Sequence, residues 1–413
     1  MWRKRQFAEY IGNPQKEFPK FVQHEGILQN GHLNDRPDFI ETVIDESPLA
    51  SQCADIYCQA LEGAGFEVDL DNINLSSLPW KTYTPNDLLK EICESCSRHE
   101  GAFIHISYNA NLEKSGIKLL PYCRNRVGKY NSYDYNGKVV YSPRGWENRF
   151  YHNQDTQVFY SYNPIPEVLQ AQIEHHGGIE KYPGQVYYFK FSDKYAYSQS
   201  RIERALQNAL ADNEINNYYY SSVVNNFHDL TVIRHLPFDN QRERQEFSDQ
   251  LKDVTSARRA GSFLLVEDDF SDIDGKGGRF VIENIKTEVN PERYKHIEDM
   301  NVAKIRKAYK NIPPQLIEQT PGKLGNTNGD ELKNAIAIYN MNTSSERKKI
   351  ERLFSELFRN YERVINPTNN WKIALWTIED DGTIEKKEEE PMMMPIDMDE
   401  MDENQNVEDE VIN

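Results

Sequence analysis

Two long helical patterns enclose a short segment of strand-like sequence, and this order restricts the fold more than any single motif does. Residues 198–227 contain neither proline nor glycine, and their apolar residues recur at helical spacing. A second helical pattern covers 290–312, with Pro291 in its first turn. Residues 228–290 predict a strand, a polar helix and two further strands that flank an Asp/Gly turn as a β-hairpin. One helix therefore leads out to a small module and another leads back.

The segment after the second helix is "NIPPQLIEQTPGKLGNTNGDE", Asn311–Glu331. The residue before a proline is disfavoured in a helix, so Pro313 and Pro314 are predicted to end the helix and fix its exit. Pro321-Gly322 and the Asn/Gly run would let the chain turn back, with positive backbone angles where Gly325 or Gly329 need them. The glycine-rich part follows no strand and lacks a Lys-Ser/Thr pair, which favours a loop over a nucleotide-binding cradle. Loops of this length are usually functional or disordered.

A third helical pattern begins near Asp330. It is predicted to be interrupted at "NMNTSS" and to restart with Thr343 and Glu346 at the spacing of a capping box. Asn366-Pro367 would end this long kinked helix, and a return strand is predicted within 371–379.

The preceding region, 45–195, predicts a mixed α+β domain, whereas residues 1–45 are predicted to be irregular. Asn136-Gly137 is a signal for a hairpin turn. The pattern predicts a helix that follows Ser47 and ends at Gly63 or Gly65, and a second helix at 85–99. Strands are predicted at 66–70, 101–109, 117–121, 138–142, 157–161 and 185–191.

The net charge of −18 is unevenly distributed along the chain. Residues 379–413 contain fifteen Asp or Glu and two Lys, so the first 378 residues carry a net charge of only −5. The acidic, methionine-containing tail is predicted to be disordered. The mildly acidic body has no general basic signature of a sequence-specific DNA-binding protein. No apolar run is long enough to span a membrane, and the first residues do not form a secretory signal.

Five cysteines without a secretory signal indicate reduced thiols. Cys93 and Cys96 form a CxxC pair followed by His99, which raises the question of a metal site. A structural zinc site would need a second ligand pair at matching spacing, and the sequence has none. The pair lies on the apolar face of the 85–99 helix, so buried structural thiols are favoured over a metal site.

The sequence predicts no catalytic residue, no cofactor and no metal site. Phosphate-loop and nucleophile-elbow motifs are absent. When "DDFSDIDGKGG" is aligned on Gly275 as a calcium loop, Phe270 and Val281 occupy positions that require carboxylates, so a solvated turn is favoured. His175 and His176 lack zinc-protease spacing and are predicted to lie at the surface or in a turn.

The order of elements and several segments resemble the phage portal protein family, which forms the head-to-tail connector of tailed double-stranded DNA phages. The resemblance is carried by "IRKAYKNIPPQLI", by "FDNQRERQEFSDQLKDVTSARRAGSFLLVED", and by the upstream segments "EGAFIHISYN", "LLPYCRNRVG" and "HHGGIEKYPGQVYYFKF". It covers residues 45–378 and rests on order and pattern rather than on an invariant signature.

The resemblance implies a portal-like α+β architecture without enzymatic activity. A helical crown, which many relatives carry, is not evident after the final strand. The implied parts are a wing (1–200), stem helices (201–227 and 291–311), a clip (228–290), a tunnel loop (312–330), a kinked helix with a return strand (331–378) and the acidic tail (379–413).

The resemblance also implies partners and a location. The chain would form a homo-oligomeric ring, a dodecamer in the virion, at the special capsid vertex, after assembly in the cytoplasm of the host bacterium. Double-stranded DNA would pass through the ring past Lys323, Asn326 and Asn328 of the tunnel loop. The terminase large subunit, the neck or adaptor protein, and the major capsid and scaffolding proteins would be its partners, with no membrane involved. Apolar residues on more than one face of the 294–312 helix predict ring contacts there, including Ile305.

Two other functions remain open from the sequence. The chain could be another ring or adaptor protein of a phage neck, although such adaptors are usually much shorter. It could also be a DNA-processing enzyme, which should show a recognisable cluster of acids, nucleophiles or metal ligands.

Overall fold

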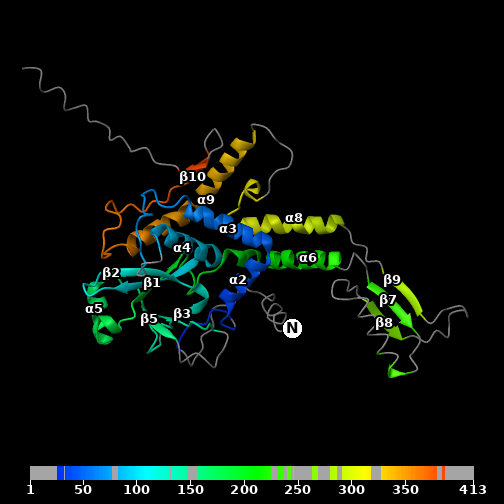
Figure 1. Ribbon diagram of the computed structural model, residues 1–413, viewed down its shortest axis with the longest axis horizontal. Helices are drawn as coiled ribbons and strands as arrows, with labels where there is room; N and C mark the ends of the chain where they lie inside the picture. The colour runs from blue at the N-terminus through cyan, green and yellow to red at the C-terminus, as the bar shows by residue number, and fades with distance from the viewer. Residues whose placement is uncertain are drawn as a thin grey trace, which may run out of the picture.

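A globular body and a small distal sheet are joined by two helices that run side by side (Figure 1). The helices are α6 (Leu206–Val224) and α8 (Pro291–Ala308), linked by a hydrogen bond of 2.8 Å from Asn208 Nδ2 to Asn301 Oδ1. The computed structural model describes residues 26–31, 33–76, 82–130, 132–146, 156–224, 230–235, 240–242, 245, 263–267, 280–285, 291–317, 327–378 and 384–386.

The body contains a six-stranded mixed sheet with the order β2-β1-β6-β5-β4-β3. All neighbouring strands are antiparallel except β5 and β6, which are parallel because α5 (Pro166–His175) lies in the connection between them. This arrangement confirms five predicted strands, with small shifts at their ends. The bounds are β1 Gly101–Tyr108, β2 Lys114–Leu120, β3 Asn125–Val127, β4 Lys138–Tyr141, β5 Gln157–Ser161 and β6 Gln185–Lys190.

Helices cover one face of this sheet and build the main core. The predicted helices are confirmed as α3 (Pro48–Glu62) and α4 (Pro85–His99), and α4 begins with a capping box between Thr84 and Asp87. Cys93 and Cys96 are fully buried on the apolar face of α4, as predicted. The opposite face of the sheet packs a second cluster that includes Phe103, Phe159 and Tyr197. The sheet is therefore buried on both faces.

Two predictions for the N-terminal half are wrong. The region 1–45 contains a helix, α2 (Arg36–Glu46), whose Ile40 and Val43 are buried; residues 1–25 and 32 lie outside the described part of the chain. Its Asn-Asp-Arg-Pro start resembles a turn, and its apolar stripe is short, so tertiary packing rather than sequence pattern defines it. The predicted strand at 66–70 is reduced to a single bridge from Phe66 to Ile373.

The distal sheet has a different pairing from the predicted hairpin. Its order is β8-β7-β9, so β7 (Leu230–His235) lies in the centre, parallel to β8 (Phe263–Glu267) and antiparallel to β9 (Phe280–Ile285). The long connection after β7 permits the parallel pairing. The hairpin prediction failed because it paired neighbours in sequence. Of the predicted polar helix, only residues 240–242 and 245 are described.

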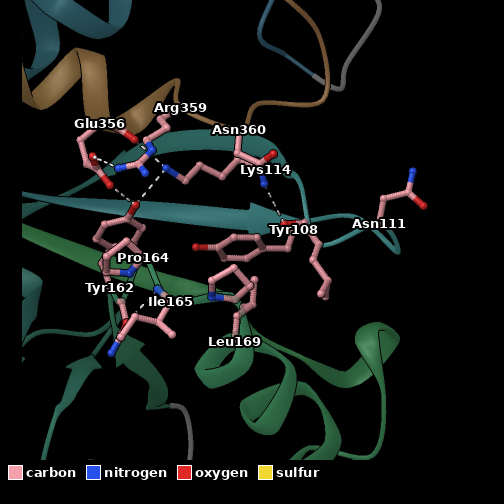
Figure 2. Close-up of a pocket in the computed structure, with 13 residues that line it drawn as sticks. Tyr108, Asn111, Lys114, Tyr162, Pro164, Ile165, Leu169, Glu356, Arg359 and Asn360 are labelled. Atoms are coloured by element: carbon pink, nitrogen blue, oxygen red, sulfur yellow. Dashed lines mark hydrogen bonds and ion pairs between the residues drawn. The ribbon is translucent and has the colours of Figure 1, made fainter.

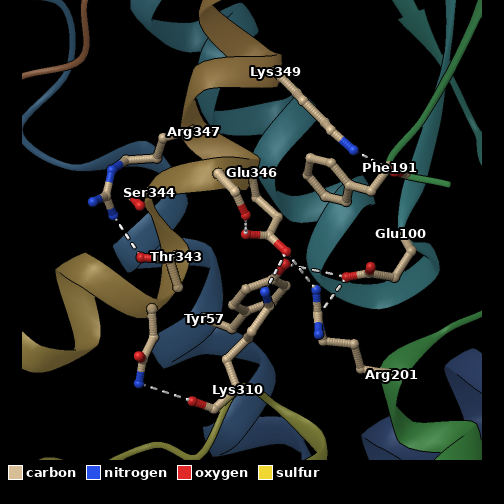
Figure 3. Close-up of polar contacts among 12 residues, drawn as sticks. Tyr57, Glu100, Phe191, Arg201, Lys310, Thr343, Ser344, Glu346, Arg347 and Lys349 are labelled. Atoms are coloured by element: carbon tan, nitrogen blue, oxygen red, sulfur yellow. Dashed lines mark hydrogen bonds and ion pairs between the residues drawn. The ribbon is translucent and has the colours of Figure 1, made fainter.

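The long helix α9 extends from Thr327 to Leu357 and continues through the segment where an interruption was predicted. Thr343 Oγ1 donates to the carbonyl of Tyr339 at 2.9 Å, a side-chain bond that tends to bend helices. Arg347 also donates to the carbonyl of Asn340. Figure 3 shows the ribbon changing direction at Thr343 and Ser344. The breaking signal in the sequence thus corresponds to a local bend within one helix.

Part of the acidic tail forms a strand. Strand β10 (Trp376–Ile378) pairs antiparallel with β11 (Ile384–Lys386), so the prediction of disorder from residue 379 onward is wrong for β11. The remaining tail residues lie outside the described part of the chain. Within the described residues, no helix is both long enough and apolar enough to cross a membrane.

Candidate functional site

The base of the predicted tunnel loop is a sharp, well-bonded turn after α8. The helix ends at Ala308, and Lys310 and Asn311 then adopt left-handed backbone angles, with φ of 64° and 55°. The amide of Ile312 donates to the carbonyl of Arg306 at 3.2 Å, and Arg306 Nε donates back to the carbonyl of Ile312 at 2.8 Å. This pair of bonds closes the helix end.

The two prolines follow this turn and do not cause it. Pro313 is extended, with φ −58° and ψ 141°, and Pro314 opens a short 3₁₀ turn, η5 (Pro314–Leu316). The prediction that the prolines end the helix is therefore wrong: the left-handed residues Lys310 and Asn311 end it. The prolines fix the direction in which the chain leaves.

The turn is attached to α9, the helix that follows the loop. Tyr339 Oη donates to the carbonyl of Tyr309 at 3.0 Å, and Asn342 Nδ2 donates to the carbonyl of Lys310 at 3.4 Å. Tyr309 and Ile312 are fully buried in the main core. The loop therefore leaves from backbone that is fixed against the helix to which it returns.

A buried ionic cluster lies beneath this attachment and joins five elements (Figure 3). Glu346 of α9 accepts from Lys310 Nζ at 2.7 Å and from Arg201 Nη2 at 3.1 Å. Arg201 belongs to η4 (Arg201–Ala205), and its Nε lies 2.7 Å from Glu100 Oε1, directly after α4. The Arg201 guanidinium also lies 4.8 Å from the ring centre of Tyr57 on α3. Arg201 thus links the body helices to the turn that carries the loop.

The charges of this cluster depend on one another. Burial alone would raise the pKa of Glu346. Hydrogen bonds from Lys310 and Ser345 outweigh this effect and hold that pKa below its usual value. Burial raises the pKa of Glu100, and the charge of Arg201 only partly offsets this. A buried charge whose partner is removed is strongly destabilising, so the cluster requires all of its members.

The other predicted site residues are only partly placed. Gly322, Lys323, Gly325 and Asn326 lie outside the described part of the chain. Asn328 falls in the first turn of α9, which begins at Thr327 rather than near residue 330. Sequence reasoning missed Arg201, Glu100 and Lys310, because no local spacing links charged residues so far apart in the chain.

A pocket of about 460 Å³ lies at the opposite end of the body, between the sheet edge, α5 and the end of α9 (Figure 2). Lys114 Nζ donates to Tyr162 Oη at 3.1 Å and to the carbonyl of Glu356 at 2.6 Å, and Tyr162 Oη donates to Glu356 Oε1 at 2.6 Å. Burial lowers the pKa of Lys114 to about 8, with Glu356 opposing the shift. Pro164, Ile165 and Arg359 also line the pocket.

The stem helices change character along their length. Near the body, Ile305 of α8 is fully buried within the chain's own core. Farther out, Tyr220 of α6 is 72% exposed and Met300 of α8 is 39% exposed. The prediction that Ile305 contacts a neighbouring subunit is therefore wrong, because the monomer already covers it.

His175 and His176 are confirmed at the end of α5, in a surface turn.

Comparisons with solved structures gave low-identity matches over most of the chain. One is a chain of the virion of a native gene transfer agent particle, with 12% identity, a TM-score of 0.48 and 86% of each chain covered. A second, from the neck of that particle computed with C12 symmetry, has 13% identity and a TM-score of 0.46, covering 79% of this chain and 81% of the other. A third is an HK97 family phage portal protein from Corynebacterium diphtheriae, with 9% identity and a TM-score of 0.39, covering 75% of this chain and 89% of the other.

No family model matches the chain, and no curated protein matches it.

Proposed function

We propose that this protein is a portal: a ring at the special vertex of a phage-like capsid through which double-stranded DNA enters and leaves. The observation that carries the proposal is the order and placement of α6, the distal sheet, α8, the closed turn at Lys310-Asn311 and α9. One helix leads out, its neighbour leads back, and a polar loop departs from a rigid base. Under this proposal the chain would lie in the neck of a virion, which is the location that the names of two matched structures give for their own chains.

The loop base has the mechanical property that a DNA channel requires. Hydrogen bonds from Tyr339 and Asn342 fix the departure point against α9, and the ionic cluster fixes α9 against the body. In a symmetric ring, every copy of the loop would then lie at one height around the axis. Lys323 is the only basic residue between Asn311 and Glu331. One cation per subunit on small polar neighbours would contact phosphates briefly without reading sequence.

The net charge of the two stem helices favours passage of DNA over tight binding of DNA. Helix α6 has two acidic residues and no basic one, and α8 has five basic and three acidic residues, so together they carry no net charge. Nonspecific affinity for DNA comes mainly from basic residues that neutralise phosphates. A neutral stem avoids a strong electrostatic trap along the channel.

The remaining parts receive roles within this proposal. The distal sheet β7–β9 would be the clip that contacts the terminase large subunit during packaging and the neck protein afterwards. The sheet-containing body would be the wing, which faces the major capsid and scaffolding proteins. The stem helices would contact their neighbours in the ring through exposed residues such as Tyr220 and Met300. No step in this role requires a catalytic residue or a cofactor.

Imaging of the purified full-length protein tests the proposal. Negative-stain class averages should show closed rings with a central hole, and mass photometry should give a mass near that of a dodecamer. A preparation that remains a compact monomer under all assembly conditions, or that hydrolyses DNA, would overturn the portal assignment. A ring that caps a preformed connector but supports no packaging would favour a neck adaptor instead.

A further inference from the structure

Three side chains of different chemistry converge at a junction that the portal role does not use. They are Glu41 of α2, His99 in the last turn of α4, and Cys123 of the 3₁₀ turn η2 (Tyr122–Arg124). One oxygen, one nitrogen and one sulfur atom from these residues lie within 4.8 Å of one another. Among the described residues, this is the one group of at least three potential metal ligands that comes this close.

The junction is buried at His99 and Cys123 and open to solvent at Glu41. The His99 and Cys123 side chains are buried, at 4% and 6% exposure. Glu41 is 42% exposed and faces solvent. An ion could enter past Glu41 and meet a nitrogen and a sulfur that are shielded from bulk water. A fourth position on the Glu41 side would remain available to a water molecule.

The ligands are already oriented. The His99 ring is stacked on Tyr122, with centroids 4.3 Å apart and planes at 11°, and its Nε2 lies 3.0 Å from Glu41 Oε1. Cys123 is the next residue after Tyr122, and its carbonyl accepts a 2.9 Å hydrogen bond from Arg126 Nη1. The stacked tyrosine restricts the His99 ring, and the arginine bond restricts the backbone that carries Cys123.

We propose that Glu41, His99 and Cys123 bind a divalent transition-metal ion of the zinc type. Imidazole nitrogen, thiolate sulfur and carboxylate oxygen form a zinc-type ligand set, with three protein ligands and one open position. Zinc bonds of about 2.0–2.3 Å place tetrahedral ligand atoms about 3.3–3.8 Å apart. The His99–Glu41 pair, at 3.0 Å, would therefore open slightly, and no pair, all being within 4.8 Å, would need to close by more than about 1.5 Å. On binding, the Cys123 S–H bond is replaced by a sulfur–metal bond and the proton passes to solvent. The metal loses bound water, and no electrons are transferred.

The site differs from the one that the CxxC pair suggests. Cys93 and Cys96 are fully buried in the apolar face of α4, whereas His99 lies on the side of that helix that meets α2 and η2. The sequence favoured buried structural thiols at the CxxC pair, and it did not connect the neighbouring His99 to Glu41 and Cys123. A metal at Glu41-His99-Cys123 would connect α2 and η2 to the end of α4, independently of ring formation.

Cobalt binding tests the proposal. The purified full-length chain is stripped with a chelator and titrated with Co²⁺ while absorption is recorded. We expect saturation at one ion per chain, a near-ultraviolet thiolate-to-cobalt charge-transfer band, and visible bands of tetrahedral intensity. Zn²⁺ should displace the cobalt and raise the melting temperature. Saturation without a thiolate band, or no stoichiometric binding, would overturn the proposal.

Matched variants identify the ligands. Cys123→Ser should remove the thiolate band, and Glu41→Gln should weaken binding at least tenfold; because Glu41 is half-exposed, this second variant remains informative if Cys123→Ser folds poorly. Cys58→Ser, which changes a half-buried thiol on α3 outside the cluster, should leave the spectrum unchanged. Loss of the band in Cys58→Ser, or full binding by Glu41→Gln, would show that the ion binds elsewhere.

Discussion

The two ends of the stem helices differ in what covers their apolar side chains. At the body end, Ala209 of α6 and Ile305 of α8 are fully buried by the chain itself. Farther from the body, Tyr220 near the end of α6 and Met300 midway along α8 remain exposed in the single chain. An isolated helix gains most of its stability from packing of its apolar face. The part near the body is therefore packed by the chain itself, whereas the exposed side chains farther out would be covered only in the ring that we propose.

The largest expected effect compares a buried position and an exposed position on α8. Ile305→Asp would place an unpaired charge in the core and cost more than about 4 kcal/mol, so little folded protein should be recovered. Met300→Asp should give a folded chain that fails to form rings, because its site is exposed in the monomer and would be covered in the proposed ring. Circular dichroism reports folding and mass photometry reports assembly. Folded Ile305→Asp monomers, or intact Met300→Asp rings, would contradict the division.

The second effect concerns the ionic cluster at the body end. Arg201→Ala would leave Glu100 buried without its ion-pair partner and reduce its contacts to Tyr57, which should cost about 3–5 kcal/mol of unfolding free energy. Arg352→Ala, an exposed change on α9, should cost less than about 0.5 kcal/mol. Urea unfolding of assembly-deficient protein, such as chains that also carry Met300→Asp, measures both. Similar midpoints for the two variants would mean that the cluster does not stabilise the body.

A third, smaller effect appears only at alkaline pH. The folded-state pKa of Lys114 is lowered from 10.5 to about 8, so the unfolded chain binds more protons between these values. Stability should therefore rise with pH across that window, by ~3 kcal/mol at most, because the penalty for the buried charge is relieved as the lysine deprotonates. Lys114→Met should flatten this rise relative to wild type. Lys118→Met, an exposed change on the same strand, should not, and parallel curves for all three proteins would refute the shift.

The sequence predicted the parts of this fold that local rules govern. The cap at Thr84 and the apolar face of α4 give that helix clear ends and a clear inner side. Pairing and long-range contacts were not predictable in the same way. Nothing local places β7 between β8 and β9, and nothing local links Arg201 to Glu346, 145 residues away.

The end of α8 illustrates the same limit. The prolines are conspicuous in the sequence, but the helix stops at non-glycine residues with positive φ, which local pattern rarely reveals. Lys310 and Asn311 hold this conformation because the turn is bonded to Arg306 and to α9. The prolines and glycines therefore located the tunnel loop in the sequence. The rigidity of the loop base comes from other residues, which the sequence pattern did not single out.

The smallest expected effect on stability is also the most direct test of the tunnel loop. Because α9 begins at Thr327, a deletion of residues 322–326 removes Lys323 and Asn326 without shortening the helix. The rigid base lies outside the deleted segment, so unfolding free energy and ring assembly should remain within error of wild type. Packaged heads should nevertheless lose DNA, because the collar of loop tips would be wider.

Lys323→Gln in the full-length loop separates the charge of the loop from its bulk. If heads with Lys323→Gln retain DNA about as well as wild type, the loss of DNA in the deletion is due to loop size. If heads with the deletion fill and keep DNA normally, the loop is only a connection between α8 and α9, and its proposed contact with DNA is wrong.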